Sequence, residues 1–407
     1  MAYGFTSDDV AFLRSGAGRA ALAESSALPL TDATRIADVG AVRRSVGERY
    51  AAAVLETVVL RRKSAAKLAD AGEWLFTGDA LQQASATPVA RHRASRLAGR
   101  DVHDVTCSVG ADLVELARVA RRALGSDVDA VRLEMARHNA SVAGVTPGVV
   151  RADALAPVSR GTVVVADPAR RDSAGRRTWK PADFLPPLDG LVDAYPGRPL
   201  SIKCAPGMDF TIAPWAEEVE LVSLDGAVRE ACLWRGLSDG VSRRATVLRS
   251  DGAQWTLTDA EPDEIPVREP GKWIIDPDGA VVRAGLVRHY AARHGLWQLD
   301  ERIAYLTGDT PPPGVRAFRV LEHGPYNEKS LRSVLKRLDV GRLEILVRGL
   351  DIDPDALRRR LKPRGHAEST VVLTRIGRSP AVFVCQAERI PSAGGIPGGG
   401  SVGSPGS

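Results

Sequence analysis

Apolar residues in the first quarter of the chain recur at the three- and four-residue spacing of an amphipathic helix. One group is Val10, Phe12 and Leu13, and a longer series follows at Val42, Val46, Tyr50, Val54 and Val58. This period places an apolar stripe along one face of each helix. Thr-Ser-Asp-Asp at 6–9 and Thr-Asp at 31–32 supply side-chain oxygens that favour helix starts. Residues 1–98 are therefore predicted to form an N-terminal helical domain.

The period changes after residue 98, where short β-branched runs alternate with helical stretches. The expected strands lie at 102–107, 148–150, 162–166 and 200–204, and the expected helices at 111–120 and 130–140. Such alternation indicates a parallel sheet with right-handed crossovers. Two further pairs of strands follow, turning at the Asp-Gly dipeptides 225–226 and 251–252, which are hairpin signals. Residues 99–258 are thus predicted to form an α/β domain whose sheet ends in an antiparallel hairpin.

The remaining third of the chain divides by composition. Residues 259–312 are rich in Pro, Asp and Gly but keep buried-type residues, so they are predicted to be a connector that packs. Residues 313–391 are predicted to form a small α/β domain, and the Gly/Ser/Pro-rich tail 392–407 is expected to be disordered. The small domain has expected strands at 317–320, 343–347, 370–375 and 381–385, with helices at 327–338 and 353–361.

Composition narrows the class of protein. The 407 residues are 44% apolar, enough for a large core, and no apolar run is long enough to cross a bilayer. These features predict a cytoplasmic protein with no membrane partner. The four cysteines lie far apart without ligand spacing, so neither a disulfide framework nor a metal site is expected. The net charge of +5 permits a polyanionic partner without requiring one.

Small and acidic residues follow the successive strands of the α/β domain. Cys107-Ser108-Val109-Gly110 makes a small-residue turn before a helix, although the Gly-x-Gly-x-x-Gly signature of dinucleotide sites is absent. Asp127, in Gly125 to Asp129, falls at the end of the expected second strand, and Asp153 and Asp167 follow the third and fourth strands at 148–150 and 162–166. A carboxylate at the second strand can accept hydrogen bonds from both ribose hydroxyls, and one at the third can accept from an adenine amino group. Together these residues favour a nucleoside site over an ordinary crossover.

Several phrases occur in the order typical of a known family. They are Trp74-Leu75-Phe76, Ala84-Ser85-Ala86-Thr87-Pro88, Asp104 to Gly110, Gly125 to Asp129, Ala136-Arg137-His138-Asn139-Ala140 and Asp153. Residues 80–210 thereby resemble class I S-adenosylmethionine-dependent methyltransferases, most closely the RNA methyltransferase branch that includes the trimethylguanosine synthases. With Ala205-Pro206-Gly207-Met208-Asp209-Phe210, Leu306-Thr307-Gly308-Asp309 and Arg348-Gly349-Leu350-Asp351, nearly the whole chain resembles bacterial methyltransferases with a C-terminal THUMP-like domain.

The resemblance implies a fold, a cofactor and a set of contacts. The fold would be a Rossmann-like class I methyltransferase sheet with a terminal antiparallel hairpin, an N-terminal helical domain and a small C-terminal α/β THUMP-like domain. S-adenosyl-L-methionine would be the cofactor, with Asp127 at its ribose and Asp153 at its adenine. Its amino-acid end would lie against Asp104 and the turn formed by Thr106, Cys107, Ser108 and Gly110, and the segment containing Thr87 and Pro88 would lie beside it.

The residues after the fourth strand carry the catalytic question. Amino-group methyltransferases usually have Asn/Asp/Ser-Pro-Pro-aromatic there, whereas this chain has Asp167-Pro168-Ala169-Arg170. The missing second proline and ring put nitrogen specificity in doubt. Asp167 is the candidate for orienting or deprotonating the acceptor, beside Pro168, and Arg170 could stack on a base or pair with a phosphate. Cys204 offers an alternative as a thiolate nucleophile, although buried cysteines are usually inert.

Three basic runs favour a nucleic-acid partner. They are Arg170, Arg171, Arg176, Arg177 and Lys180; Arg358 to Arg364; and Arg91-His92-Arg93 with Arg96 and Arg100. Each could also be a solvated surface or helix end. The interpretation is a methyltransferase that modifies a base in structured RNA, tRNA or rRNA. The alternatives are an RNA-binding protein with a degenerate methyltransferase domain, and a methyltransferase for a small molecule or protein. The oligomeric state is not predicted.

Overall fold

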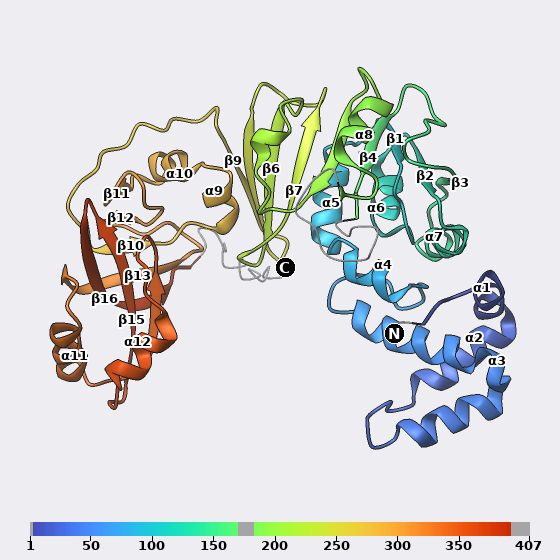
Figure 1. Ribbon diagram of the computed structural model, residues 1–407, viewed down its shortest axis with the longest axis horizontal. Helices are drawn as coiled ribbons and strands as arrows, with labels where there is room; N and C mark the ends of the chain where they lie inside the picture. The colour runs from blue at the N-terminus through green and yellow to red at the C-terminus, as the bar shows by residue number, and fades with distance from the viewer. Residues whose placement is uncertain (1–2, 170–182, 392–407) are drawn as a thin grey trace, which may run out of the picture. The chain divides into compact units, whose positions relative to one another are not determined.

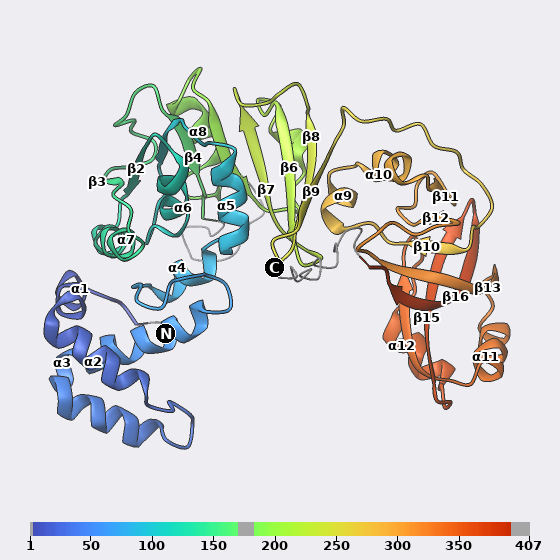
Figure 2. The same ribbon diagram turned by 180° about the vertical axis from the view of Figure 1, so that it is seen from behind.

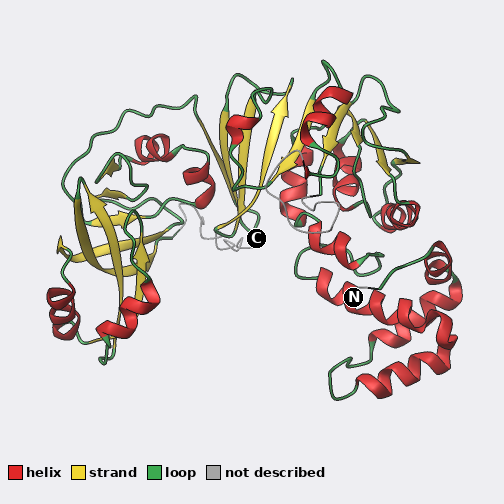
Figure 3. Cartoon of the chain, viewed as in Figure 1, coloured by secondary structure: helices red, strands yellow, loops and turns green. Residues whose placement is uncertain are grey.

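The computed structural model describes residues 3–169 and 183–391. By its internal contacts the chain divides into two compact units, Met1–Thr256 and Leu257–Ser407 (Figure 1). Helices dominate the first part of the chain and strands dominate after about residue 215 (Figure 3). Arg170 with the rest of the basic segment 170–182, and the tail 392–407, lie outside the described residues.

The predicted helices of the N-terminal region are present. They are α1 (Ser7–Arg14), α2 (Gly16–Ser26) and α3 (Arg35–Ser64), followed by the shorter α4 (Gly78–Gln83) and α5 (Thr87–Ser95). Helix α1 begins with a capping box, because the Asp9 N–H donates to Thr6 Oγ1 while the Thr6 N–H donates to Asp9 Oδ2. Val10, Val54 and Val58 of the apolar stripes are buried in a common core.

A sheet of nine strands, counted over the described residues, forms the body of the first unit. Its order is β3-β2-β1-β4-β5-β7-β6-β8-β9. The first five run parallel: β1 (Asp101–Asp104), β2 (Arg122–Asp127), β3 (Gly148–Arg151), β4 (Val163–Ala166) and β5 (Leu200–Cys204). Helices α6 (Ala111–Val119), α7 (Ala130–Val142) and α8 (Leu188–Ala194) lie between them in the chain. The α/β alternation read from the sequence is confirmed.

The far end of this sheet is antiparallel, as expected. Strands β6 (Glu218–Leu224) and β7 (Ala227–Arg235) form the hairpin at Asp225-Gly226, and β7 pairs antiparallel with β5. Strands β8 (Arg243–Leu248) and β9 (Gln254–Thr258) extend the sheet, with β8 parallel to β6. Asp225 and Gly226 both have positive φ, 51° and 78°, which an Asp-Gly turn adopts readily.

The second unit contains a sheet of seven strands among the described residues, seen from two sides in Figures 1 and 2. Its order is β11-β12-β10-β13-β16-β15-β14. The strands are β10 (Trp273–Ile275), β11 (Trp297–Gln298), β12 (Leu306–Gly308), β13 (Arg316–Pro325), β14 (Val340–Val347), β15 (Ala367–Ile376) and β16 (Ser379–Arg389). Its helices are α9 (Gly279–Arg283), α10 (Val287–His294), α11 (Glu328–Arg337) and α12 (Pro354–Leu361).

Both faces of this second sheet are covered, and that explains the role of residues 259–312. The buried leucines of α11 and α12, including Leu331 and Leu357, pack with Val371 in one core. Val372, next along β15, points into a second core that contains Ile274 and Tyr305. Because successive side chains of a strand alternate in direction, the apolar β15 needs a layer on each side. The stretch expected to be a connector supplies strands and one of these layers.

Candidate functional site

A cavity of about 540 Å³ opens at the carboxyl ends of the parallel strands of the first unit. Parallel sheets bind ligands at this edge because the loops after the strands converge there. Seven residues predicted from the sequence line the cavity: Asp104, Thr106, Cys107, Ser108, Asp127, Asp153 and Asp167. Other lining residues come from α4 and the segment after it, from α5, from the start of α6 and from Leu185-Pro186-Pro187.

The turn after β1 has the close backbone approach expected of a ligand-binding loop. The Thr106 N–H donates to Asp104 Oδ1 (3.1 Å), and Ser108 adopts a positive φ of 50°. Gly110 then caps α6 with φ of 85°, and a Cβ on it would lie 3.2 Å from the Ala136 Cβ. Glycine is required at 110 by this backbone conformation and by packing on α7, whereas the turn residues before it face the cavity.

Asp127 at the end of β2 joins two parts of the cavity wall. Its Oδ2 accepts a hydrogen bond from the Ser108 N–H (3.0 Å), and its Oδ1 accepts one from the Asp129 N–H (2.9 Å). Asp129 in turn caps α7 by accepting from the Val131 N–H. Each carboxylate oxygen has two lone pairs, so Asp127 keeps acceptor capacity for two hydroxyls of a ligand.

The rim beside Asp153 combines one carboxylate with apolar side chains. Asp153 Oδ1 accepts from the Leu155 N–H (2.9 Å), and the Tyr195 hydroxyl donates to the Ala154 carbonyl, which fixes this loop. Val128, Leu155 and Leu185 line the cavity with large exposed fractions of 59%, 39% and 50%. Exposed apolar side chains around a pocket suit a flat aromatic ring, because they bury surface against both of its faces.

Asp104 is electrostatically unusual. Burial, together with the nearby Asp112 carboxylate, raises the pKa of the Asp104 carboxyl to about 8. The cation of this region, Arg93, is engaged elsewhere: its guanidinium lies 2.7 Å from Asp112 and 2.8 Å from Glu230. A ligand that brings a positive group to Asp104 would favour the ionised carboxylate and would be bound more tightly by it.

Asp167 lies where the parallel sheet meets its antiparallel part. Its N–H donates to Thr106 Oγ1 (2.7 Å), and its Oδ2 accepts from Lys203 Nζ at 2.5 Å. Lys203 also donates to Ser85 Oγ (3.1 Å). The pairing of Lys203 with Asp167 was not predicted from the sequence. A lysine in the apolar strand Leu200–Cys204 was the signal that could have revealed it.

The other predicted site residues lie outside the cavity lining. Thr87 Oγ1 accepts from the Ala69 N–H (2.9 Å), and the Thr87 N–H donates to the Lys67 carbonyl, so this residue joins the chain before α4 to the start of α5. Pro88 occupies the first turn of α5, and Pro168 is buried beside Asp167. Ser85, two residues before Thr87, makes the contact with Lys203.

Asn139 fixes the Cys107–Gly110 turn from the side of α7. It is fully buried on α7, and its side-chain amide donates to the carbonyls of Leu75 and Val109 while its Oδ1 accepts from the Leu75 N–H. An amide side chain satisfies these three backbone groups, which would otherwise be unpaired in the core. Asn139 therefore links the segment before α4 to the Cys107–Gly110 turn without reaching the cavity.

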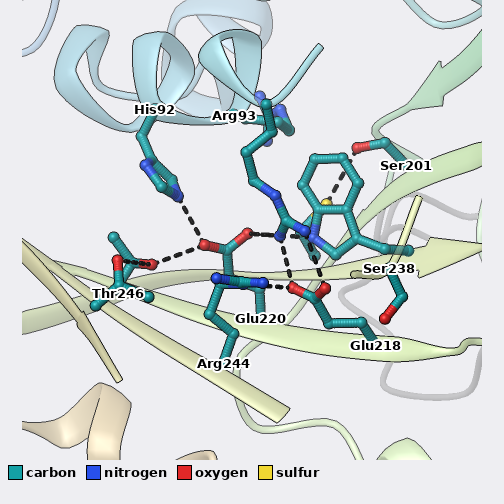
Figure 4. Close-up of polar contacts among 12 residues, drawn as sticks. His92, Arg93, Ser201, Glu218, Glu220, Ser238, Arg244 and Thr246 are labelled. Atoms are coloured by element: carbon teal, nitrogen blue, oxygen red, sulfur yellow. Dashed lines mark hydrogen bonds and ion pairs between the residues drawn. The ribbon is translucent and has the colours of Figure 1, made fainter. Parts of the chain in front are cut away.

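Helix α5 is joined to strands β6 and β7 by charged groups that we call the ionic layer, defined as His92, Arg93, Arg96, Glu218, Glu220 and Glu230. Figure 4 shows His92 pointing toward Glu220, with Glu218 beside it. Arg96 lies 2.7 Å from Glu218 and 2.6 Å from Glu220, and His92 lies 2.6 Å from Glu220. All three glutamates are at most 2% exposed. The basic run considered for nucleic-acid binding is thus largely used inside the fold, with Arg91 also paired to Glu115.

Comparisons with known proteins agree with this geometry. Residues 315–387 match the THUMP domain-like family, and residues 6–64 match a domain of unknown function. The crystal structure of a candidate methyltransferase from Porphyromonas gingivalis superposes with a TM-score of 0.70 at 19% identity, covering 95% of this chain and 99% of that one. The fold is therefore that of a methyltransferase with N-terminal helices and a C-terminal THUMP-like region.

Sequence relatives define the family. Uncharacterised S-adenosylmethionine-dependent methyltransferases from two strains of Mycobacterium tuberculosis are each 54% identical over 363 residues, 86% of this chain and 100% of theirs. The chain belongs to this family of S-adenosylmethionine-dependent methyltransferases, as the resemblance implied. Over the described residues, no helix is long and apolar enough to cross a membrane, and no group of three or more potential metal ligands occurs.

Proposed function

We propose that the cavity binds S-adenosyl-L-methionine and that the enzyme transfers its methyl group to structured RNA, tRNA or rRNA. The observation that carries the cofactor site is the convergence of Asp104, Asp127 and Asp153 on one cavity at the strand ends. The three carboxyls match the three polar parts of this cofactor: the ammonium, the ribose hydroxyls and the adenine amino group. The apolar rim of Val128 and Leu155 matches the adenine ring.

Each of the proposed cofactor-binding residues would contact a different part of S-adenosylmethionine. Asp127 would accept hydrogen bonds from the ribose hydroxyls, and Asp153 would accept from the adenine amino group. Asp104 would face the ammonium, and the N-terminus of α6 beside the Thr106–Gly110 turn would face the carboxylate, because helix N-termini attract anions. When bound, the cofactor supplies a methyl group already activated by a sulfonium. What this chain must add is alignment of the acceptor at Asp167.

The proposal that RNA is the acceptor rests on the THUMP-like match in the second unit and on exposed positive charges there. The THUMP-like match covers 315–387 and includes the basic end of α12, where Arg359, Arg360, Lys362 and Arg364 are exposed. Exposed cations can contact a phosphate backbone independently of sequence. The sequence-level expectation that the acceptor is a base stays a prediction, since it depends on the groups around Asp167.

Cofactor binding and the identity of the acceptor are tested by separate experiments. Isothermal titration calorimetry of the purified protein should show binding of S-adenosylmethionine, and Asp127→Ala should weaken it by 10-fold or more, because hydrogen bonds to a charged group contribute about 1.5–3 kcal/mol each. Asp251→Ala, an exposed acid in the β8–β9 turn, is the matched control and should bind normally. Unchanged affinity in Asp127→Ala would refute the proposed cofactor site.

The acceptor is tested with tritiated S-adenosylmethionine and RNA from a strain of the source organism that lacks this gene. Label should enter RNA from this strain and not RNA from the parent strain, which is already methylated. Binding of RNA without transfer of label would favour a degenerate methyltransferase domain. Transfer to a small molecule or protein, with no label in RNA, would favour the remaining alternative.

A further inference from the structure

The groups around Asp167 bear on which atom receives the methyl group. We propose that the acceptor is a hydroxyl oxygen, on RNA the ribose 2′-hydroxyl, and that Lys203 is the positioning residue that makes Asp167 competent to accept its proton. The inference rests on the proposed function, because it assumes that the cofactor cavity is the methylation site and that RNA enters it. It departs from the base expected from sequence.

The first observation is the geometry of one ion pair. Lys203 Nζ lies 2.5 Å from Asp167 Oδ2 and 3.1 Å from Ser85 Oγ. The Asp167 side chain is 32% exposed and lines the cavity, whereas the Lys203 side chain is only 12% exposed and is not among the lining residues. An acceptor in the cavity would therefore meet the carboxylate rather than the ammonium. Lys203 acts through Asp167 rather than by direct contact.

The second observation is that the surroundings keep this lysine charged. Lys203 on β5 is paired in register with Cys232 on β7, so Glu230, two residues away, lies on the same face of the sheet. Burial opposes the ammonium, but the carboxylates of Asp167, Asp112 and Glu230 outweigh it and raise the pKa of Lys203. Lys203 therefore acts as a cation and not as a base.

A permanent cation at this place discriminates between acceptor atoms. A neutral amine nitrogen becomes positive as it attacks the methyl group, and a nearby ammonium disfavours that charge. A hydroxyl oxygen becomes negative as it loses its proton, and the same ammonium stabilises that charge. In the motif after the fourth strand, position 170 is Arg, so the aromatic ring that usually stacks on a target base is absent, and position 169 is Ala in place of the second proline.

The step balances in atoms and charge. The hydroxyl oxygen forms a bond to the methyl carbon while the sulfur–carbon bond of the cofactor breaks, and the electron pair of that bond stays on sulfur. The hydroxyl proton passes to the Asp167 carboxylate and is later released to water. The products are a methyl ether and S-adenosylhomocysteine. Ribose 2′-hydroxyls are the hydroxyl groups that RNA presents along its whole length.

The deciding experiment locates the label within RNA. RNA methylated with the full-length protein and tritiated cofactor is hydrolysed with alkali, which requires a free 2′-hydroxyl to cut each link. Label in alkali-resistant dinucleotides is expected. Label in mononucleotides would place the methyl on a base and overturn this inference while leaving the proposed function intact. RNA that takes up no label, from protein shown to bind the cofactor, would overturn both.

Variants of Lys203 test its role separately. Lys203→Met should lower kcat by about 100-fold, in the range for losing general acid–base assistance, with cofactor affinity by calorimetry unchanged. Lys203→Arg, which keeps the charge beside Asp167, should restore part of the rate. Equal rate losses in Lys203→Met and Lys203→Arg would show that the charge is not used and that the residue is merely structural.

Discussion

Two regions of the first unit bury carboxyl groups in opposite ways. In the ionic layer, Glu220 is 1% exposed and lies against His92, Arg96, Thr246 and Trp234. Although burial disfavours its charge, the hydrogen bonds and electrostatic attraction of the neighbouring His92 and Arg96 side chains lower the pKa of Glu220 to about 2. In the cavity, Asp104 is 4% exposed, and burial with the nearby Asp112 raises its pKa to about 8.

The difference separates a structural site from the proposed ligand site. The partners of Glu220 on α5, His92 and Arg96, complete that site within the fold and fix the helix on the sheet. At Asp104 the neighbouring Arg93 is paired with Asp112 and Glu230, so a proposed ligand with a positive group would offset the cost of burying this carboxyl. Perturbed acids of this second kind mark functional sites. Arg96→Met and Glu220→Gln change the first side of this contrast, Asp104→Asn changes the second, and Cys204→Ser changes a neighbour of Lys203 outside both.

Arg96→Met should have the largest effect on stability. It leaves Glu218 and Glu220 buried with fewer positive partners, and removing one member of a buried ion pair typically costs about 3–5 kcal/mol. The urea-induced unfolding transition of the first unit measures this loss in the free energy of unfolding. Arg91→Met, which removes the more exposed pair with Glu115, is the control and should cost less than about 1 kcal/mol. Equal losses in the two variants would contradict a structural ionic layer.

Glu220→Gln should change the acid side of the stability curve. Because the folded-state pKa of Glu220 lies near 2, below the 4.5 of an unperturbed Glu, its contribution is present above about pH 4.5 and is lost as pH falls toward 2. The stability gap between wild type and variant should therefore shrink by about 2 kcal/mol between pH 6 and pH 3. Parallel unfolding curves across this range would show that Glu220 is not held ionised.

Asp104→Asn should change the neutral and alkaline side instead. The folded-state pKa near 8 lies above the unperturbed 3.8, so the wild type without ligand loses stability as pH rises from about 4 to about 8. The amide cannot ionise, so the variant should gain stability relative to wild type across that rise in pH. Wild type should release a proton when it binds S-adenosylmethionine, and calorimetry in buffers of different ionisation enthalpy should detect this release. Asp104→Asn should bind the cofactor without releasing a proton. Proton release that persists in Asp104→Asn would assign it to another group.

Cys204→Ser should have the smallest effect. Cys204 is buried at the end of β5, next to Lys203, and no covalent role is assigned to it. Methyl transfer from tritiated cofactor should stay within about twofold of wild type, as expected for a buried cysteine acting as a small apolar side chain. Loss of transfer with cofactor binding intact would revive the thiolate mechanism.

The strand ends were predictable because their signals are local. The β-branched runs before Asp153 and Asp167 each predict both a strand and the acid that follows it, and parallel pairing then brings such acids to one edge. The turn at Asp225-Gly226 was predictable for the same reason, since an Asp-Gly pair adopts the required backbone by itself. The basic run of α5 was ambiguous, because its partners Glu218 and Glu220 lie more than a hundred residues away.

Sequence alone determined the order of helices and strands, the acids at the strand ends and the resemblance to a methyltransferase, because each depends on neighbours along the chain. Tertiary structure alone decided which charges are satisfied. It placed Lys203 on Asp167, Arg93 between Asp112 and Glu230, and residues 259–312 against a sheet. Whether a cation within the fold pairs with Asp104 depends on distances between segments that are remote in sequence. Burial makes such charge pairs far stronger than they are in water.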